Sequence, residues 1–491
     1  MNKIYLSKSK YCRAVQCNKM LWLDKNKPEE AMDLNNESIF ETGTKVGELA
    51  KGIFGKYINI EYRPNLKEMI IETENYMNEK PNIITEASFT YENNFCSVDI
   101  LKNDIDGVEI YEVKSSTGIT EIYLHDVAYQ VYILTNLGYK VKSANIIHIN
   151  NKYEKYGELE LKKLFKIENV TEIALEMQDG IEEKILEINE YMSNIEEPEI
   201  PIGEHCFNPY NCAYWKYCTR NLPEKNIFDI RKMTINKKLE YHNKGMYSLE
   251  DLIDEDINQK FKEQIEYEIY DKEPKIEKEK IKEFLNELYF PLYFLDFETF
   301  KSAIPIFDGT RPYQQIPFQY SLHYIENEEG ELKHKKFLAE ANEDPRRKIA
   351  ERLLTDIPEN ACILAYNMTF EKGVIENLAN VFEDLRERLM KIHNNIKDLM
   401  IPFRNREYYV KEMEGSYSIK KVLPALFPDE PELDYNNLSI IHNGDEAMNI
   451  FPKLTEMTKQ EQEEIRKALL EYCKLDTLAM VKIWEKLKEI K

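Results

Sequence analysis

The stretch NNFCSVDILKNDIDGVEIYEVKSSTG, residues 93–118, decides the fold of the first part of this 491-residue chain. Polar and apolar side chains alternate up to Asp99, as in a strand with one buried face. The polar segment NDIDG follows as a turn. Glu112 and Lys114 then stand two residues apart on the return strand, so their side chains point to the same side. The pattern predicts a β-hairpin with one carboxylate on each strand and a lysine beside them.

Such a hairpin has the side chains needed to bind a divalent cation. Asp99 and Glu112 offer the hard oxygen ligands that Mg²⁺ prefers. Lys114 would orient or help to deprotonate an attacking water, or hold a phosphate oxygen. On this stretch alone, a surface hairpin with a Glu–Lys pair is the competing interpretation.

The neighbouring segments give the hairpin a context. A predicted helix, HDVAYQVYILTNLGY at residues 125–139, follows at once and carries Asp126 and Gln130 on adjacent turns. This order resembles the PD-(D/E)xK nucleases of the RecB-like family. The stretch FETGTKVGELAKGIF, residues 40–54, is similar to the first helix of that family, with Gly47 where the family has a histidine.

The resemblance implies a restriction-endonuclease-like α/β fold and hydrolysis of phosphodiester bonds with Mg²⁺ or Mn²⁺. It assigns the catalytic and metal-binding roles to Asp99, Glu112 and Lys114. Because the histidine is replaced, Glu48 or Glu86 would supply an extra oxygen ligand, and Gln130 is a further candidate.

Cysteines are the second signal in this part of the chain. HCFNPYNCAYWKYC, residues 205–218, places three of them at even intervals, and YCRAVQCNKMLWL, residues 11–23, supplies two more. A closed tetrahedral metal site needs four ligands. Both stretches resemble one branch of the RecB-like nucleases, which includes the AddB-type subunits and the nucleases of CRISPR adaptation. That branch binds a [4Fe–4S] cluster through one early cysteine and three late ones.

For this sequence the resemblance implies a cluster held by Cys17, Cys206, Cys212 and Cys218, with Cys12 in reserve. Thiolates are the preferred ligands of such clusters. A zinc ion is the alternative occupant, because four cysteines also suit Zn²⁺. Either group would cross-link distant parts of the chain and act as a structural clamp, not as a redox catalyst.

A second group of acids lies in the last part of the chain. The apolar strand LYFLDFETF, residues 292–300, carries Asp296 and Glu298 on one face. Two carboxylates in such a strand are unfavourable to bury unless a cation binds them. Farther along, ACILAYNMTFEKGVIENLA predicts a buried strand, a short turn and a helix that opens around Glu371.

The final predicted helix, residues 461–490, carries Tyr472 and Asp476 four residues apart, on one face. The order of these elements resembles the DEDD exonucleases of the RNase H-like superfamily, in the branch marked by a tyrosine. The resemblance implies two divalent ions about 3.5–4 Å apart and a tyrosine that orients the attacking water. The implied residues are Asp296, Glu298, Glu371, Asp476 and Tyr472, with Asp398 as a reserve acid.

Pattern and composition divide the chain into three regions. We expect a nuclease-like domain over residues 1–224, a helical linker over 225–288, and an RNase H-like mixed-sheet domain over 289–491, so the fold class is α/β. In the linker, residues 233–257 predict a helix, a glycine-containing turn and a second helix. They resemble the helix-hairpin modules that grip DNA backbones; a plain helical linker is the alternative.

Composition limits the partners. The formal net charge of −23 argues against a protein that coats nucleic acid by bulk attraction. A nucleic-acid enzyme is still allowed, since divalent ions neutralise carboxylates at a reacting phosphate. No apolar run reaches the roughly 20 residues of a membrane helix, and no signal peptide is evident. We therefore expect a cytoplasmic protein that does not bind membranes.

Together these features predict a metal-dependent nuclease that acts on DNA ends or single strands, with 3′-to-5′ polarity in its last part. RNA stays open as a substrate, because no motif reads bases. Two further hypotheses stay open as well. The iron–sulfur half could bind DNA while only the DEDD half cuts, or the protein could be an inert iron–sulfur scaffold that binds nucleic acid. Its role would lie in DNA repair, processing of foreign DNA or antiviral defence.

Overall fold

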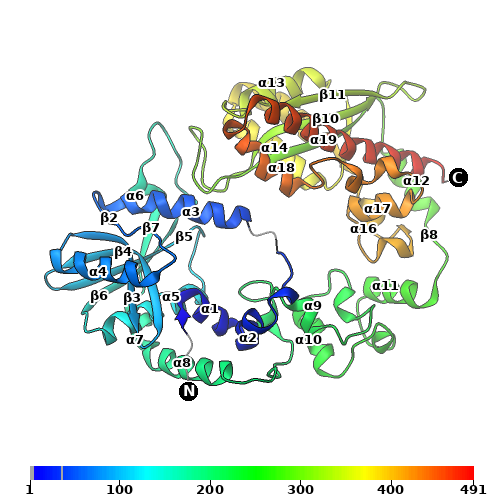
Figure 1. Cartoon of the computed structure of the whole chain (residues 1–491). Coiled ribbons are helices and arrows are strands. Elements are labelled where there is room, and N and C mark those ends of the chain that lie inside the picture. Colours follow the sequence, from blue (N-terminus) through cyan, green and yellow to red (C-terminus); the bar gives the residue numbers. More distant parts are fainter. Residues whose placement is uncertain (1–4, 35–36, 491) are drawn as a thin grey trace. The chain divides into compact units, whose positions relative to one another are not determined.

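The computed structural model describes residues 5–34 and 37–490, and the chain is a mixture of helices and strands (Figure 1). It divides into two compact units. The first comprises Met1–Leu222 and Ser302–Tyr313, and the second comprises Pro223–Lys301 and Gln314–Lys491. A short segment from the last part of the chain therefore folds as part of the first unit.

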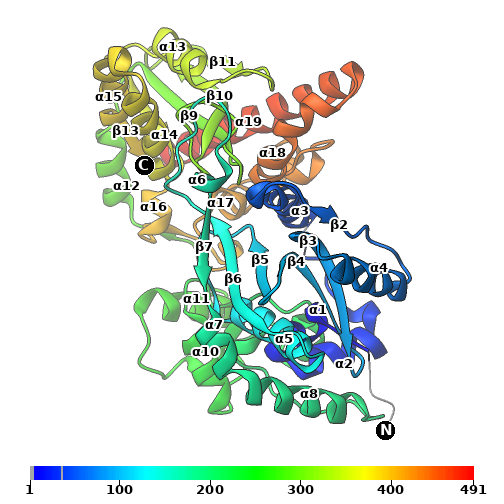
Figure 2. The ribbon, with the colours of Figure 1, turned by 90° about the vertical axis from the view of Figure 1, so that its left-hand side faces the viewer.

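The first unit is built on a seven-stranded sheet with the order β2-β3-β4-β5-β6-β7 and with β1 paired to β4. Its strands are β1 (Leu6–Ser7), β2 (Ile58–Asn59), β3 (Ile83–Tyr91), β4 (Asn94–Asp104), β5 (Gly107–Lys114), β6 (Val141–Ile149) and β7 (Phe165–Asn169). β3, β4 and β5 are antiparallel neighbours, whereas β5 and β6 run parallel. Figure 2 shows β4, β5 and β6 next to one another.

β4 and β5 form the hairpin expected for residues 93–118. Asp104 pairs with Gly107, so only two residues make the turn. Gly107 has a φ of +135°, and a Cβ atom there would lie 2.3 Å from the backbone oxygen of Lys140. Any other residue would therefore strain the backbone and clash with the backbone of Lys140 in the neighbouring segment.

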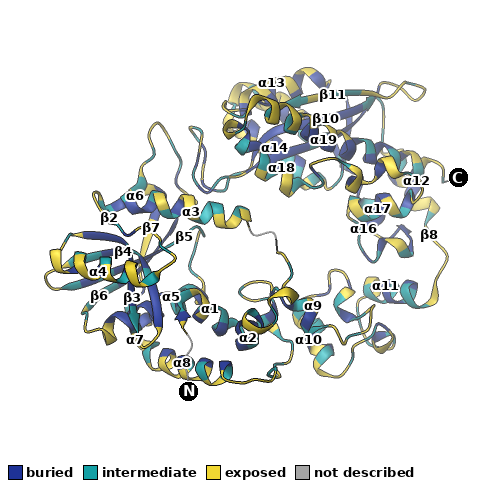
Figure 3. Ribbon diagram, viewed as in Figure 1, coloured by how far each residue is buried: buried dark blue, intermediate teal, exposed yellow. Residues whose placement is uncertain are grey.

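Helices cover the sheet of the first unit. They are α1 (Lys8–Gln16), α2 (Asn18–Asn26), α3 (Glu37–Lys51), α4 (Leu66–Glu79), α5 (Glu121–Asn136), α6 (Leu161–Leu164), α7 (Thr171–Glu176), α8 (Gln178–Met192) and α9 (Trp215–Cys218). α5 packs on the sheet with one side and on α1, α7 and α8 with the other. The ring of Tyr11 in α1 stacks on that of Tyr129 in α5, with centroids 4.5 Å apart. The strands β3, β4, β5 and β6 and the inner faces of these helices are mostly buried, whereas β7 is largely exposed (Figure 3).

The second unit has a five-stranded sheet with the order β11-β10-β9-β12-β13. Its strands are β9 (Leu292–Phe300), β10 (Ile316–Ile325), β11 (Lys333–Leu338), β12 (Cys362–Ala365) and β13 (Ile396–Asp398). β9, β10 and β11 are antiparallel, whereas β9, β12 and β13 are parallel, so the sheet is mixed. A separate ribbon pairs β8 (Lys275–Ile276) with β14 (Tyr408–Tyr409).

Ten α-helices are described in the second unit: α10 (Ile235–Asn243), α11 (Gln259–Tyr270), α12 (Lys278–Asn286), α13 (Arg346–Asp356), α14 (Met368–Val381), α15 (Arg386–Asn394), α16 (Ile401–Arg404), α17 (Ile419–Leu426), α18 (Gly444–Ile450) and α19 (Lys459–Lys488). α19 begins with a capping box formed by Thr458 and Glu461. It packs against β9 and β10, which places its buried face on the strand that carries the predicted acids.

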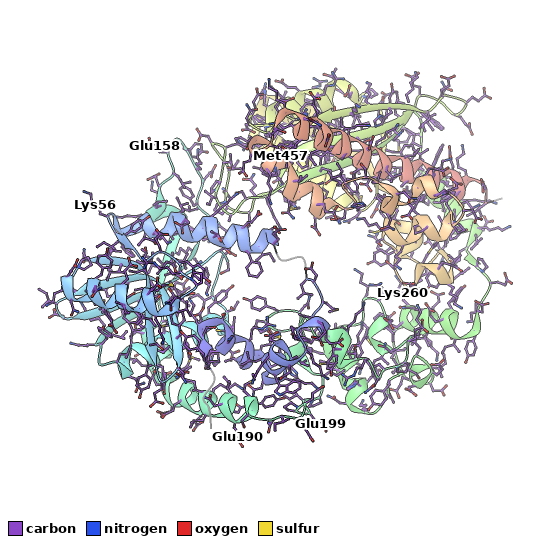
Figure 4. The ribbon with its side chains drawn as sticks, viewed as in Figure 1. Lys56, Glu158, Glu190, Glu199, Lys260 and Met457 are labelled. Carbon is purple, nitrogen blue, oxygen red and sulfur yellow. The ribbon has the colours of Figure 1, made fainter. Side chains whose placement is uncertain are left out.

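Several acidic side chains of the first unit lie on its surface. Glu158, Glu190 and Glu199 of the first unit are exposed and project from the ribbon (Figure 4). Among the helices of residues 5–34 and 37–490, none combines the length and the apolar character needed to cross a membrane.

Candidate metal centres

Three elements of the first unit bring acidic side chains around one lysine. β4 contributes Asp99, β5 contributes Glu112 and Lys114, and α5 contributes Asp126. The Lys114 ammonium donates to Glu112 Oε1 at 2.8 Å and to Asp126 Oδ2 at 2.6 Å. Asp99 Oδ2 accepts the backbone N–H of Val113 at 2.7 Å. The predicted acids and lysine thus lie together, and Asp126 joins them as a third acid. We call these four side chains the first cluster.

Gln130 lies against the first cluster. Its amide nitrogen donates to Glu112 Oε2 at 2.7 Å and to Asp126 Oδ1 at 3.1 Å. Asp126 and Gln130 are one helical turn apart, so both face the hairpin. The amide oxygen of Gln130 is buried without a hydrogen-bond partner. A buried oxygen without a donor is a ligand available to a hard cation.

Lys8 is a component that the sequence reasoning missed. Its ammonium lies 2.9 and 2.8 Å from the two carboxylate oxygens of Glu112. It also lies 3.8 Å from Asp99 Oδ1 and 3.7 Å from Asp126 Oδ1. Lys8 stands 104 residues before Glu112, at the start of α1, and reaches the cluster because β1 pairs with β4. No local pattern could have indicated this contact.

The charges of the first cluster are only partly balanced. Burial and the neighbouring Glu112 carboxylate raise the pKa of Asp99 to about 7. Burial also opposes ionisation of Glu112, but the ammonium groups of Lys114 and Lys8 outweigh it and lower the pKa of Glu112. Three carboxyl groups face two ammonium groups, and the raised pKa of Asp99 leaves that carboxyl only partly ionised near pH 7. A bound divalent cation would favour its ionised form.

The two reserve acids of this unit differ in position. Lys51 binds both, at 2.6 Å from Glu48 Oε1 and 3.3 Å from Glu86 Oε1. The Glu48 side chain is 61% exposed. Burial and Glu112 are the main causes of the raised pKa of Asp99, and the Glu86 charge adds to the same rise. Glu86 is therefore the reserve acid nearer to the cluster. At Gly47, an added Cβ atom would meet nothing within 4 Å.

The four predicted cysteine ligands line one small cavity. Cys17 lies between α1 and α2, Cys206 ends the 3₁₀ helix Glu204–Cys206, Cys212 lies in the loop after it, and Cys218 ends α9. Each of the four is a free thiol. Burial raises the pKa of Cys206 and of Cys212 to about 11, and the other thiols of the cavity add to both shifts. Four thiols that line one buried space form a donor set suited to a thiolate-bound cluster or a zinc ion. No three of these sulfur atoms lie within 4.8 Å of one another.

Cys12, the reserve cysteine, is not among the residues that line this cavity. It lies on α1, and its raised pKa results from burial and from the Asp126 carboxylate.

Hydrogen bonds hold the segment that carries Cys206 and Cys212 against α1. The amide nitrogen of Gln16 donates to the backbone oxygens of His205 at 2.8 Å and Tyr210 at 2.7 Å.

A second cluster of four acids forms in the second unit, from Asp296 and Glu298 of β9, Glu371 of α14 and Asp476 of α19. Burial and repulsion from the other three acids raise the pKa of Asp296 well above its ordinary range. A ligand atom of Asp296, one of Glu298 and the sulfur of Cys473 lie within 4.8 Å of one another. Asp296 and Glu298 thus lie close together, and the charges of Glu371 and Asp476 act on Asp296 from farther away.

Glu371 carries a buried oxygen without a partner. Its Oε2 atom makes no hydrogen bond. Burial, with the nearby Asp398 and Asp476 charges, raises the pKa of Glu371 to about 8. A buried, mutually repelling set of acids is unfavourable by itself, and bound divalent cations would relieve the repulsion. The second cluster thus fits metal binding by its donor set and by its unpartnered oxygen.

Tyr472 borders the second cluster, and two residues that the sequence reasoning missed lie beside it. The hydroxyl of Tyr435 donates to Asp476 Oδ1 at 2.6 Å. The ring centroids of Tyr435 and Tyr472 are 6.0 Å apart. Lys420 Nζ lies 5.5 Å from the Tyr435 ring centroid. Burial and the Asp476 charge raise the pKa of Glu298, and the Lys420 ammonium opposes that rise. The sequence around Lys420 did not indicate that its side chain would lie beside Glu298.

Lys420 also lines a pocket beside Glu298, together with Phe370, Asn443 and Met448. The reserve acid Asp398 has another environment. One of its carboxylate oxygens accepts the backbone N–H groups of Asn367 at 3.0 Å and Met400 at 3.1 Å. Asp398 therefore fixes the backbone beside Glu371.

Comparison with known families gives one match. A family model described as a domain of unknown function, DUF2779, matches residues 293–418. This range includes Asp296, Glu298 and Glu371 of the second cluster. No solved structure matches the chain.

Curated relatives match parts of the chain. The uncharacterized protein MG366 of Mycoplasma genitalium is 27% identical over 221 residues, which cover 42% of this chain and 33% of that protein. Its homologue in Mycoplasma pneumoniae is 28% identical over 209 residues, which cover 39% of this chain and 31% of that protein. The chain thus spans about a third of the length of these relatives.

A third relative carries a functional name. The CRISPR-associated exonuclease Cas4 of Methanocaldococcus jannaschii is 34% identical over 119 residues, which cover 24% of this chain and 58% of that protein. Part of the chain is thus similar to a nuclease.

Proposed function

We propose that this chain is a metal-dependent nuclease with two sites for phosphodiester hydrolysis, one in each unit. The observation that carries the proposal is the gathering of acidic side chains from separate elements in each unit, around Lys8 and Lys114 in the first and around Asp296 in the second. A buried oxygen without a partner lies beside the first cluster, on Gln130, and within the second, on Glu371. The similarity to the Cas4 exonuclease supports the same reaction class. The substrate would be DNA ends or single strands, with RNA as a second polymer of the same chemistry.

In the first cluster, Asp99, Glu112 and Asp126 would hold Mg²⁺ or Mn²⁺. A bound divalent ion supplies charge neutralisation at the phosphate and a more acidic water. Lys114 donates hydrogen bonds to two of these carboxylates, which fixes their orientation and keeps its ammonium at the place where a phosphate oxygen would arrive. Gln130 restrains Glu112 from the other side.

In the second cluster, Asp296, Glu298, Glu371 and Asp476 would hold two such ions. Tyr472 lies beside them and would orient the attacking water. Tyr435 fixes Asp476 through its hydroxyl, and Lys420 offers a positive charge to the substrate phosphates. We assign 3′-to-5′ polarity to this unit and a role in DNA repair, processing of foreign DNA or antiviral defence.

The cysteine cavity would hold a [4Fe–4S] cluster, with Zn²⁺ as the alternative. A bound group supplies a cross-link between Cys17 and the loop of residues 206–218. Elemental analysis of anaerobically purified protein separates the two. Iron and sulfide in equal amounts would support the cluster. Zinc without iron would show that the cavity holds Zn²⁺ instead.

Digestion of end-labelled single- and double-stranded DNA with Mn²⁺ tests the proposal. Lys114→Ala and Asp296→Ala should each remove one set of products, and the double variant should remove both. Wild-type protein that binds DNA without cutting it under any divalent ion would overturn the nuclease and leave the scaffold hypothesis.

A second candidate function follows from Lys8. Its ammonium contacts the three acids that would hold the cation. If Lys8 excludes the cation, the first unit binds the strand and only the second unit cuts. In that case Asp296→Ala alone would abolish all cleavage, and Lys114→Ala would leave the products unchanged.

A further inference from the structure

Three tyrosines from separate segments gather beside Lys114 in the first unit. Tyr123 belongs to α5, and Lys114 Nζ lies 5.1 Å from the centroid of its ring. Tyr313 ends the Ser302–Tyr313 segment, and its hydroxyl donates to the backbone oxygen of Ser115. Tyr210 lies in the loop between two cysteine ligands. Burial and the Tyr123 hydroxyl raise the pKa of Tyr210 to about 12, as the two side chains are neighbours.

Packing accounts for only part of these rings, because Tyr123 and Tyr313 pack against the hydrophobic clusters of the first unit but Tyr210 is in neither cluster. Tyr210 is 57% exposed, although it lies beside a lysine that contacts two buried acids. Tyr123 and Tyr313 are only half-buried. Tyrosines that serve a core have their rings enclosed, as Tyr11 and Tyr129 do nearby. The exposed ring of Tyr210 and the exposed parts of the Tyr123 and Tyr313 side chains present aromatic surface beside the first cluster.

The backbone at Tyr313 is held in an unusual state. Its φ is +61°, in the left-handed region that bulky residues rarely adopt. Its N–H donates to the backbone oxygen of Ser302 at 2.7 Å, which closes the segment. The segment is tied down again where Gly309 N–H donates to the backbone oxygen of Lys155 at 2.7 Å. A strained aromatic residue kept in a fixed position indicates a functional constraint.

We propose that Tyr123, Tyr210 and Tyr313 form a stacking platform for unpaired bases of a single-stranded nucleic acid that enters the first cluster. The inference rests on the proposed nuclease function and names the form of its substrate. Base stacking on aromatic rings tolerates any sequence, because every base has a π-face. In a duplex those faces are already covered by neighbouring bases, so the platform selects single strands or frayed ends. Lys114 would hold the adjoining phosphate.

Binding measurements on the full chain test the platform. Ca²⁺ replaces Mn²⁺ to prevent cutting, and fluorescence anisotropy reports the affinity for a labelled single strand and for a blunt duplex. Tyr210→Ala and Tyr123→Ala should each weaken single-strand binding by about fivefold or more, the lower end expected for one lost base stack. Duplex affinity should change less than about twofold, since only the platform is lost. Tyr210→Trp keeps a ring and should retain the wild-type affinity.

Two controls protect the test. Tyr62, which is 78% exposed in the same unit, stands outside the platform, so Tyr62→Ala should bind as wild type. In the wild-type protein, a single strand that carries 5-iodouracil should photo-cross-link to Tyr123, Tyr210 or Tyr313, which peptide mapping identifies without any variant.

Unchanged single-strand affinity in both alanine variants, with no cross-link to these tyrosines, would overturn the platform. If Lys114→Ala still removes Mn²⁺-dependent products in that case, the proposed nuclease stands without it. Cross-links to the tyrosines in a protein that never cuts would support the platform and remove the nuclease.

Discussion

At the scale of single residues, Lys8 and Lys114 bind the same carboxylate from different elements. Glu112 accepts hydrogen bonds from both, and Gln130 adds a third. Two of these partners follow from the hairpin and helix patterns, because they lie within 18 residues of Glu112. Lys8 lies 104 residues before Glu112, near the start of the first unit. The local part of the site was therefore predictable, and the long-range part was not.

Replacing Lys8 with methionine should change metal binding and stability in opposite directions. Without the ammonium, the three acids repel one another more strongly and attract a divalent ion more strongly. The free energy of unfolding should fall by about 1–3 kcal/mol without divalent ions, because charged hydrogen bonds are lost. Calorimetry with Mn²⁺ should show tighter binding by about tenfold, which corresponds to about 1.4 kcal/mol.

Both measurements are made in an Asp296→Asn background to limit binding at the second cluster. Lys10→Met is the matched control, because Lys10 is exposed on the same helix. Weaker Mn²⁺ binding in Lys8→Met than in Lys10→Met would show that Lys8 helps to build the metal site.

Glu371 gives the second cluster a pH dependence. Its pKa rises from an ordinary 4.5 to about 8 in the fold, chiefly by burial. Between those values the folded carboxyl keeps its proton while the unfolded one has lost it, so stability falls as pH rises. In EDTA, the melting temperature should be higher at pH 6 than at pH 8. Glu371→Gln should narrow that difference, and an unchanged difference would mean that Glu371 does not titrate in this range.

At the scale of elements, strands and helices with a strong pattern were predicted well. The hairpin over residues 93–118 is β4 and β5, and the helix expected at 461–490 is α19, Lys459–Lys488. The expected second helix of residues 233–257 is instead a short 3₁₀ turn, Glu250–Leu252, before α11. The acidic run around that turn favours a capped loop over a helix, because Asp251 accepts backbone N–H groups from Tyr247 and Ser248.

Alanine substitutions at two glycines test helix propensity at one position and turn geometry at the other. Gly47 lies inside α3 with open space around its missing Cβ atom, so Gly47→Ala should raise the free energy of unfolding by about 0.5–1 kcal/mol. Gly107→Ala should lower it by more than about 1 kcal/mol, because of the positive φ and the Lys140 backbone oxygen. Urea unfolding measures both. A loss in Gly47→Ala would show that helix propensity is not the dominant effect at that position.

At the scale of the whole chain, the cysteine cavity joins Cys17 to the segment of residues 206–218. Most of the sequence of the first unit lies between them. Cys206→Ala should lower the iron or zinc content of the purified protein. Losing a cross-link of this span should lower the free energy of unfolding by about 4 kcal/mol. Cys362→Ala is the matched control, because Cys362 is also buried but lies in β12 of the other unit. Equal metal content in both variants would contradict the assigned ligands.

Contacts between distant segments limited what the sequence could predict about the chain. The resemblances placed Cys17 with the later cysteines, and the four line one cavity. Nothing in the pattern of residues 302–313 indicated that they fold with the first unit, because only a few side chains, such as Ala303 and Ile304, pack against its core. The other contacts are isolated hydrogen bonds to groups such as the backbone oxygens of Lys155 and Ser115. Such contacts leave no periodicity in the sequence.

The path of the chain through Ser302–Tyr313 restricts how this protein can be divided. The chain leaves the first unit at Leu222, returns to it for twelve residues, and leaves again at Gln314. A gene fragment that ends near residue 224 would encode an incomplete body, without Tyr313 and without the partners of Lys155. The two halves are thus interleaved at the level of the gene, and recombination could not exchange one of them cleanly at a single crossover point.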